Sequence, residues 1–134
     1  MNPVKRILII DDSEIMLSRM KRALLASSYE VITTTQVVGN ARHLIACDLI
    51  IVDFHMPGLD GSTVVQSMRT VAGSGQRKCA FYLYTSDKAV AADYARLGFD
   101  GVFTAKGDEA ELVRQVGAYF RMASMRALKT ASPK

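Results

Sequence analysis

The chain has 134 residues, of which 49% are hydrophobic and 22% are charged. This length suits one domain rather than two, and the mixed composition excludes collagen-like, coiled-coil and disordered classes. The net charge is +4, and residues 114–134 carry basic side chains without a single acid. Such clusters on a terminal helix are typically just a solvated face, so we assign no function to this one. We expect one globular domain followed by a basic tail at residues 128–134.

Two further features concern the cellular compartment. No apolar run approaches the roughly 18 residues that a membrane helix needs, and the N-terminus lacks the apolar segment and cleavage site of a signal peptide. We therefore expect a cytoplasmic protein without membrane contact. Cys47 and Cys79 share no motif spacing and lie beside apolar runs, so we interpret them as small core residues.

The first half of the chain alternates short apolar runs with helical patterns. Residues 6–10 predict a strand, and the acidic turn at 11–14 offers capping side chains for a following helix. A β-branched run at 31–35 predicts a second strand, residues 37–46 a short helix, and residues 48–53 a third strand that ends in an acid. The apolar positions that predict the first helix are Ile15, Met16, Met20, Ala23 and Leu24.

The second half repeats this alternation. In chain order we expect a Pro-Gly loop at 56–61, a helix at 62–71, a loop at 73–78, a strand at 79–84, a helix at 88–97, a strand at 101–105 and a helix at 108–126. Five strands alternating with five helices, without a hairpin signal, predict an α/β fold whose parallel sheet is covered on both faces. Ligands of doubly wound sheets bind at the carboxyl ends of the strands.

Chemically active side chains follow several of these predicted strands. Asp11 and Asp12 follow the first strand and Asp53 ends the third, so the three carboxylates converge if these strands are neighbours. Crowded carboxylates repel one another, and Mg²⁺ is the cation that prefers such oxygen ligands. Thr85 and Lys106 follow the last two strands and complete a predicted phosphate site. Helix capping explains a single acid, but not this whole set.

These residues fall in the order found in one known family. The sequence resembles the receiver domain of two-component response regulators through Asp11-Asp12, Asp53-Phe-His-Met-Pro-Gly-Leu-Asp-Gly61, Tyr84-Thr85-Ser86 and the segment from Gly98 to Lys106. The resemblance covers roughly residues 5–127 and implies a receiver domain at residues 1–127. It also implies a doubly wound (βα)5 flavodoxin-like fold, with a five-stranded parallel sheet in the order 2-1-3-4-5.

The resemblance also implies a role for each site residue. Asp53 is the implied phosphoacceptor, and the implied Mg²⁺ ligands are Asp11, Asp12, Asp53 and the backbone carbonyl of His55. The implied phosphate-contacting and switch residues are Thr85, Ser86, Lys106 and Phe103. The resemblance also implies that the side chains of His55 and Asp87 flank the water that removes the phosphoryl group. Because both are expected to face solvent, we expect their exchange to alter dephosphorylation while leaving fold stability nearly unchanged.

The lysine departs from the family pattern. Counted from Gly98, the family's lysine falls on Ala105, whereas Lys106 comes one residue later and is followed by Gly107 instead of the usual proline. A one-residue slip in a strand turns a side chain to the opposite face. Either a bulge near residues 101–102 restores Lys106 to the site, or the site lacks its ammonium group; we expect the bulge.

The bulge also decides the switch aromatic. With it, Phe103 lies three residues before the lysine, where the family places this side chain; without it, Val102 takes that place and aromatic switching is lost. A second departure is the short spacing between Asp12 and Asp53, which indicates a trimmed second helix.

We therefore expect a stand-alone response regulator that acts as a phosphoacceptor and not as an enzyme. Its expected phosphodonor is a histidine kinase or a histidine phosphotransfer protein. No residues remain for a DNA-binding domain, so the output is expected to be binding of a protein target through residues 88–127. The main alternative is a pseudo-receiver, which has the same fold but binds partners without phosphorylation.

Three further classes share part of the pattern. Cobalamin-binding domains use the Asp-x-His-x-x-Gly spacing of Asp53, His55 and Gly58, but they need downstream Ser-x-Leu and Gly-Gly motifs that this chain lacks. Haloacid-dehalogenase-type phosphatases need a second Asp where His55 stands. A dinucleotide site needs Gly-x-Gly-x-x-Gly after the first strand, which is absent.

Overall fold

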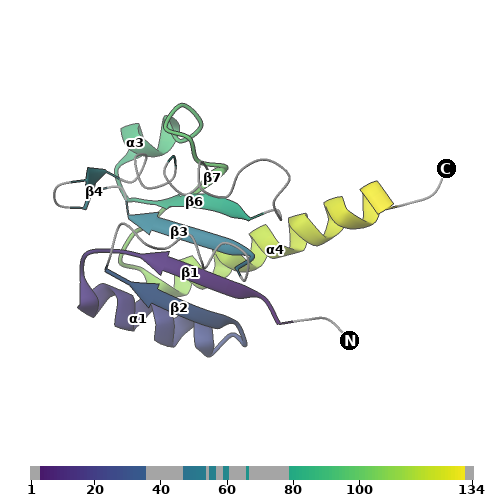
Figure 1. Ribbon diagram of the computed structural model, residues 1–134, viewed down its shortest axis with the longest axis horizontal. Coiled ribbons are helices and arrows are strands. Elements are labelled where there is room, and N and C mark those ends of the chain that lie inside the picture. Colours follow the sequence, from purple (N-terminus) through teal and green to yellow (C-terminus); the bar gives the residue numbers. More distant parts are fainter. Residues whose placement is uncertain are drawn as a thin grey trace.

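The computed structural model describes residues 4–35, 47–53, 55–56, 59–60, 66 and 79–131. Within them, a parallel sheet of five strands has the order β2-β1-β3-β6-β7 (Figure 1). Its strands are β1 (Arg6–Ile10), β2 (Glu30–Thr34), β3 (Leu49–Asp53), β6 (Ala80–Tyr84) and β7 (Gly101–Phe103). Numbered by their succession in this sheet, the strands follow the order 2-1-3-4-5, which confirms the predicted doubly wound, flavodoxin-like fold.

The central strands are apolar on both faces because helices cover both. Ile7 and Ile9 pack into one cluster of buried side chains, whereas Leu8 and Ile10 pack into the other. Successive side chains of a strand point to opposite faces, so an uninterrupted apolar run supplies two cores at once. Cys47 is fully buried in the second cluster and Cys79 packs against it, as expected for small core residues.

Two long helices lie on the face of the first cluster. These are α1 (Glu14–Leu25) and α4 (Glu109–Ala131), whereas α3 (Lys88–Ala92) belongs to the opposite face (Figure 1). Helix α1 begins after Ser13, whose hydroxyl accepts a hydrogen bond from the Met16 amide at 3.1 Å. The helix buries Leu17, Met20 and Leu24, which share one face at a spacing of three and four residues.

Ile15 is a correction to the predicted apolar stripe of this helix. Its side chain is 75% exposed. Because each helical residue turns by about 100°, a position two residues before the buried Leu17 points away from the sheet.

Several element boundaries also differ from the prediction. Strands β4 (His55–Met56) and β5 (Leu59–Asp60) form a small antiparallel pair that overlaps the loop predicted at 56–61 and begins one residue before it. Helix α3 ends at Ala92, before the predicted end at residue 97, because the amides of Asp93 and Tyr94 donate to carbonyls three residues earlier, as in turns. Strand β7 ends at Phe103, because the following residues leave the sheet. Helix α4 continues past the predicted end to Ala131.

Some predictions fall outside the described residues. These are the helices at 37–46 and 62–71, apart from residue 66, the loop at 73–78 and the trimmed second helix. Among the residues that the structure describes, no helix is both long enough and apolar enough to cross a membrane.

Candidate functional site

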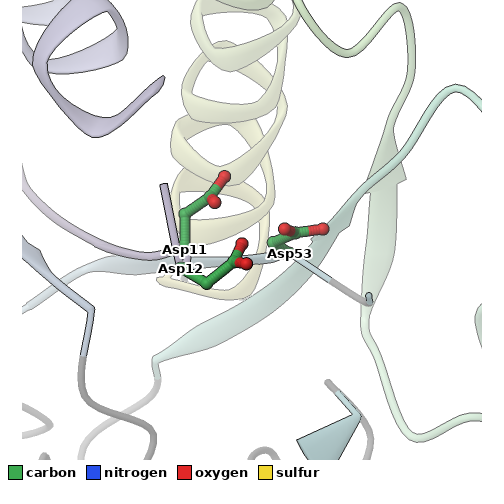
Figure 2. A group of neighbouring side chains, drawn as sticks. All are labelled: Asp11, Asp12 and Asp53. Atoms are coloured by element: carbon green, nitrogen blue, oxygen red, sulfur yellow. The ribbon is translucent and has the colours of Figure 1, made fainter. Parts of the chain in front are cut away.

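Three carboxylates meet at the carboxyl edge of the sheet. Strands β1 and β3 pair in register up to Ile10 and Val52, so the residues that follow, Asp11 and Asp53, lie side by side. Asp11 is 2% exposed and Asp53 4% exposed, whereas Asp12 is exposed. One oxygen of each carboxylate lies within 4.8 Å of the others, and Figure 2 shows the three side chains gathered at the ends of these strands.

The electrostatics of this group favour a cation. Asp11 accepts a hydrogen bond from the Ser13 amide through Oδ1 at 2.9 Å, but its buried Oδ2 has no hydrogen-bond partner among the described residues. The pKa of Asp11 is raised to about 6, chiefly by burial and in part by the nearby charge of Asp53. A buried oxygen without a partner, beside two more carboxylates, matches the hard oxygen ligands that Mg²⁺ prefers. The donor set therefore fits this ion.

Lys106 reaches the same group of carboxylates. Its Nζ lies 2.7 Å from Asp53 Oδ1, and its side chain is 25% exposed. The ion pair places one positive charge directly against the buried carboxylate, at the point where strands β3 and β7 end.

The route by which Lys106 reaches Asp53 corrects the predicted bulge. Strands β6 and β7 pair without interruption from Tyr82–Gly101 to Tyr84–Phe103, so there is no bulge at residues 101–102. Instead, the extra residue is accommodated after the strand, where Ala105 takes a left-handed backbone conformation with φ 60°. The strand register constrains only paired residues, so the extra residue fits in the turn without disturbing the sheet.

Thr85 lies at the end of β6, one residue after the partner of Asp53. It is 3% exposed, its amide donates to the Phe103 carbonyl at 3.1 Å, and its Oγ1 accepts a hydrogen bond from the Asp87 amide at 3.0 Å. Thr85 is therefore bonded to the last residue of β7 and to the residue before α3, whereas Ser86 beside it is exposed.

Asp87 has a structural contact that the sequence analysis missed. Its side chain is exposed, as expected, but Oδ1 accepts hydrogen bonds from the amides of Ala89 and Val90, at 3.0 and 3.1 Å. Asp87 is thus the N-cap of α3. Removing a capping side chain leaves amides unpaired, so this contact predicts that exchanges of Asp87 that lose the capping oxygen lower the stability of the fold.

Phe103 is buried beside the site, with 2% exposure. Its ring stacks on Tyr82 with the centroids 4.4 Å apart. Tyr82 can lie there because its cross-strand neighbour Gly101 has no side chain: a Cβ at that position would come within 2.3 Å of the Tyr82 ring. The glycine therefore makes room for the aromatic stack that covers Phe103.

His55 is placed only in part. Its backbone belongs to β4, two residues after Asp53, and its side chain lies outside the described part of the structure.

Two contacts near Lys106 were not predicted. The Tyr84 hydroxyl oxygen accepts a hydrogen bond from the Gly107 amide at 3.2 Å, and Arg19 Nη2 donates to the Gly107 carbonyl at 3.2 Å. The sequence marks Tyr84 only as the neighbour of Thr85, and nothing local to Arg19 indicates a contact with a residue so distant in the sequence.

Comparisons with known proteins agree with this geometry. The family model of the response regulator receiver domain matches residues 7–117. Among curated proteins, no significant match to the sequence was found.

Solved structures share the fold at low sequence identity. The chemotaxis response regulator CheY4 of Vibrio cholerae is 19% identical, with a TM-score of 0.70 over 87% of this chain and 98% of that one. A CheY-like receiver domain protein from Methanospirillum hungatei is 16% identical, with a TM-score of 0.74 over 92% and 99% of the two chains. A CheY-like receiver domain from Methylobacillus flagellatus is 16% identical, with a TM-score of 0.71 over 87% and 98%.

The fold, the carboxylate group and the family match point to one class of protein. Receiver domains are signalling phosphoacceptors of two-component systems rather than enzymes in the usual sense. Because the family model spans most of its length, this chain belongs to the response regulator receiver domain family.

Proposed function

We propose that this chain accepts a phosphoryl group on Asp53 from a histidine kinase or a histidine phosphotransfer protein. The observation that carries the proposal is the surrounding of Asp53, a buried carboxylate grouped with Asp11 and Asp12 and paired with Lys106 at 2.7 Å. Phosphoryl transfer depends on positioning and on neutralising the charge of the phosphoryl oxygens. This group of side chains offers both.

The reaction needs a nucleophile and a leaving group. An Asp53 oxygen attacks the phosphorus and forms the new oxygen–phosphorus bond, while the phosphorus–nitrogen bond of the donor phosphohistidine breaks. The electron pair stays on the imidazole nitrogen, which takes up a proton. The ammonium group of Lys106 exchanges its contact with Asp53 for one with a phosphoryl oxygen and offsets the added negative charge.

The carboxylates have a second role in this proposal. Asp11, Asp12, Asp53 and the backbone carbonyl of His55 would hold Mg²⁺, which when bound supplies positive charge next to the phosphoryl oxygens. The orphaned Oδ2 of Asp11 supports this assignment. The binding energy of the ion would also offset the repulsion among the carboxylates.

The proposed output is a change in protein binding. Thr85 and Ser86 contact the arriving phosphoryl group, and Thr85 transmits its shift to Phe103, to whose carbonyl its amide is bonded. Such a population shift requires the phosphoryl group to interact differently with the two states. We propose that the surface of residues 88–127 binds the downstream target in one state only.

His55 and Asp87 complete the proposed site as residues that tune the loss of the phosphoryl group. We further propose that the receiver domain comprises residues 1–127, with residues 128–134 as a basic tail; the family match at 7–117 supports the former. The cytoplasmic location stays a prediction of the sequence.

One labelling experiment tests the proposal. Incubation with acetyl phosphate and Mg²⁺, or with a panel of histidine kinases, should add one phosphoryl group in an intact-mass measurement. Asp53→Asn should abolish the adduct. Asp48→Asn, an exchange at the opposite end of β3, should retain it.

Failure of the folded wild type to be labelled by any donor would overturn the proposal and support a pseudo-receiver. That alternative depended on a displaced lysine, and the Lys106–Asp53 ion pair counts against it.

A further inference from the structure

The turn that carries Lys106 has an unusual backbone. We define the lysine turn as residues 104–108, between β7 and α4. Ala105 and Gly107, the two neighbours of Lys106, have φ angles of 60° and 100°, and the Asp108 amide donates to the Ala105 carbonyl at 3.0 Å. Left-handed conformations are unfavourable for residues other than glycine. The turn therefore needs contacts from outside to stay in this shape.

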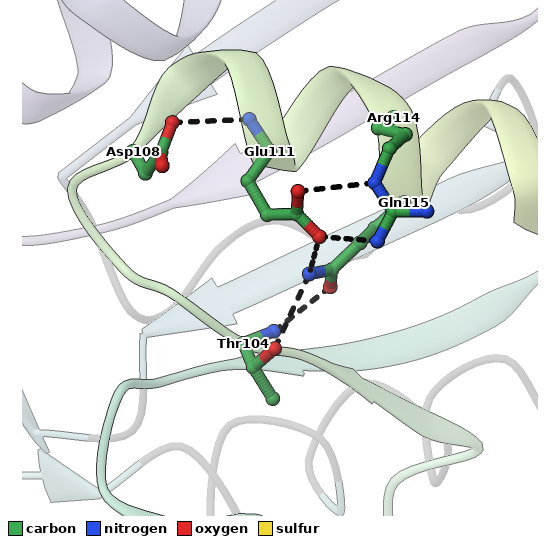
Figure 3. A network of polar contacts seen from close by, with 5 residues as sticks. All are labelled: Thr104, Asp108, Glu111, Arg114 and Gln115. Atoms are coloured by element: carbon green, nitrogen blue, oxygen red, sulfur yellow. Dashed lines mark hydrogen bonds and ion pairs between the residues drawn. The ribbon is translucent and has the colours of Figure 1, made fainter.

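Helix α4 anchors both ends of the lysine turn. The Thr104 amide donates to Gln115 Oε1 at 2.9 Å, and Asp108 Oδ1 accepts a hydrogen bond from the Glu111 amide at 3.1 Å (Figure 3). These contacts determine where the turn begins and ends. They do not restrain Lys106 in its middle.

The middle is anchored through Gly107, the residue after Lys106. Its amide donates to the hydroxyl of Tyr84, a residue of β6 that is 1% exposed and pairs with Asp53. Its carbonyl accepts a hydrogen bond from Arg19 of α1, whose guanidinium also binds Glu109 at 3.0 Å. Both backbone polar groups of Gly107 are thus bonded to side chains from two different elements.

We propose that Tyr84 and Arg19 are positioning residues that hold Gly107 so that Lys106 reaches Asp53. A lysine side chain has many rotamers, and ordering it costs conformational entropy. A restrained backbone next to it limits the directions in which the ammonium group can point. Tyr84 is suited to this role because it pairs with Asp53 across strands β6 and β3, so the sheet fixes the position of the carboxylate relative to the residue that holds the turn.

The first test is Tyr84→Phe, which removes only the hydroxyl oxygen. The consequence for phosphorylation rests on the proposed function. We expect labelling by acetyl phosphate to slow at least threefold, because small displacements of a charged group near the reacting atoms lower rates strongly. Mg²⁺ affinity, which depends on the carboxylates, should stay within about twofold of wild type. The matched control is Tyr119→Phe, another tyrosine packed against the same core cluster.

Dependence on Lys106 separates positioning from a general loss of structure. In a Lys106→Ala background, Tyr84→Phe should cause no further slowing. Arg19→Ala should behave like Tyr84→Phe, and Arg19→Lys should recover part of the rate. Arg22→Ala, an exchange of another exposed arginine on α1, should have no effect. Equal slowing with and without Lys106, or a parallel loss of Mg²⁺ affinity, would overturn the proposal.

A stability measurement decides the proposal even if no donor phosphorylates the protein. Lys106→Ala removes the ion pair with Asp53 and should shift the thermal midpoint in wild type. The shift should be smaller in Tyr84→Phe, where the pair is already loosened. The same shift in both backgrounds would show that Tyr84 does not position Lys106. Absence of labelling in wild type, by contrast, would count only against the proposed function.

Discussion

At the scale of single residues, the left-handed conformation of Ala105 accommodates the one extra residue that precedes the lysine, compared with the family pattern. Strand β7 keeps its register to Phe103, Ala105 turns into the left-handed region, and Lys106 arrives at Asp53. An alanine in this conformation costs about 1–2 kcal/mol, because its Cβ crowds the backbone. The strain is thus located at a residue adjacent to the one that contacts the site.

Exchanges of Ala105 should reveal this strain. Ala105→Gly should raise the free energy of unfolding by up to about 1 kcal/mol, because glycine adopts positive φ without a steric penalty. Ala105→Val should lower it by about 1–2 kcal/mol, because a β-branched side chain fits this region poorly. Urea denaturation measures both.

The control is Ala118→Gly within α4, which should cost about 1 kcal/mol through lost helix propensity. If Ala105→Gly destabilises the protein as much as this control does, Ala105 is not left-handed in solution.

Asp12 provides a second prediction at this scale. It is an exposed member of the carboxylate group, so Asp12→Ala should weaken Mg²⁺ binding while leaving the metal-free protein equally stable or more stable. At a Mg²⁺ concentration 100 times the dissociation constant, wild type should gain about 2.7 kcal/mol of stability. Chemical denaturation with and without Mg²⁺ measures the gain, most of which the variant should lose.

Glu14→Gln is the control for general charge effects, because Glu14 is an exposed acid of the same segment that lies outside the group of three. An unchanged Mg²⁺ response in Asp12→Ala would contradict the metal assignment.

At the scale of elements, the N-cap of α3 links the candidate site to the stability of the fold. Asp87 caps α3 with two accepted hydrogen bonds, and the amide of the same residue donates to Thr85. Asp87→Ala should therefore lower the free energy of unfolding by about 1 kcal/mol, whereas Asp87→Asn keeps a capping oxygen and most of the stability.

Both variants remove the charge near the proposed hydrolytic water. We expect the dephosphorylation rate to change severalfold in each, and an exchange of His55 to do the same. The asparagine variant provides the cleaner comparison, because its fold is preserved. Decay at the wild-type rate in the Asp87 and His55 variants would remove these residues from the mechanism.

The start of α4 provides a prediction about pH. Glu111 binds Arg114 and Gln115, and these hydrogen bonds lower its pKa from 4.5 to about 2 (Figure 3). An acid with a lowered pKa in the folded state contributes stability above its unfolded pKa, and this contribution is lost as the pH falls toward 2. The thermal midpoint of wild type should therefore be slightly higher than that of Glu111→Gln at pH 6. The difference between the two midpoints should vanish toward pH 2.

High salt should reduce the same difference, because the group is at the surface. A difference between the two proteins that stays constant from pH 6 to pH 2 would show that the Glu111 charge is not its source.

At the scale of the whole molecule, the sheet brings distant segments to one edge. Strands β1, β3, β6 and β7 are neighbours, and all run in the same direction. The residues that follow them therefore meet, although Asp11 and Lys106 lie far apart in the sequence. Helices α1 and α4 cover one face and α3 belongs to the other, so both cores support this edge (Figure 1).

Much of this arrangement could be predicted from local patterns. Uninterrupted apolar runs such as Leu49–Val52 indicate strands buried on both faces, and their alternation with helical patterns indicates a parallel sheet. The acids at the ends of the first and third strands then had to meet at one edge once those strands were neighbours. These inferences succeed because they depend on periodicity and composition, which short segments carry.

The tertiary structure alone decides how Lys106 reaches Asp53. The pattern around Gly101 allowed either a bulge or a lost ammonium group, and the actual solution, a left-handed Ala105, depends on contacts from outside the segment. Tyr84 and Arg19 bond to Gly107 across large sequence separations, and Asp87 becomes a cap only where α3 begins. Such contacts depend on which elements become neighbours when both cores are packed, and no short stretch of sequence contains that information.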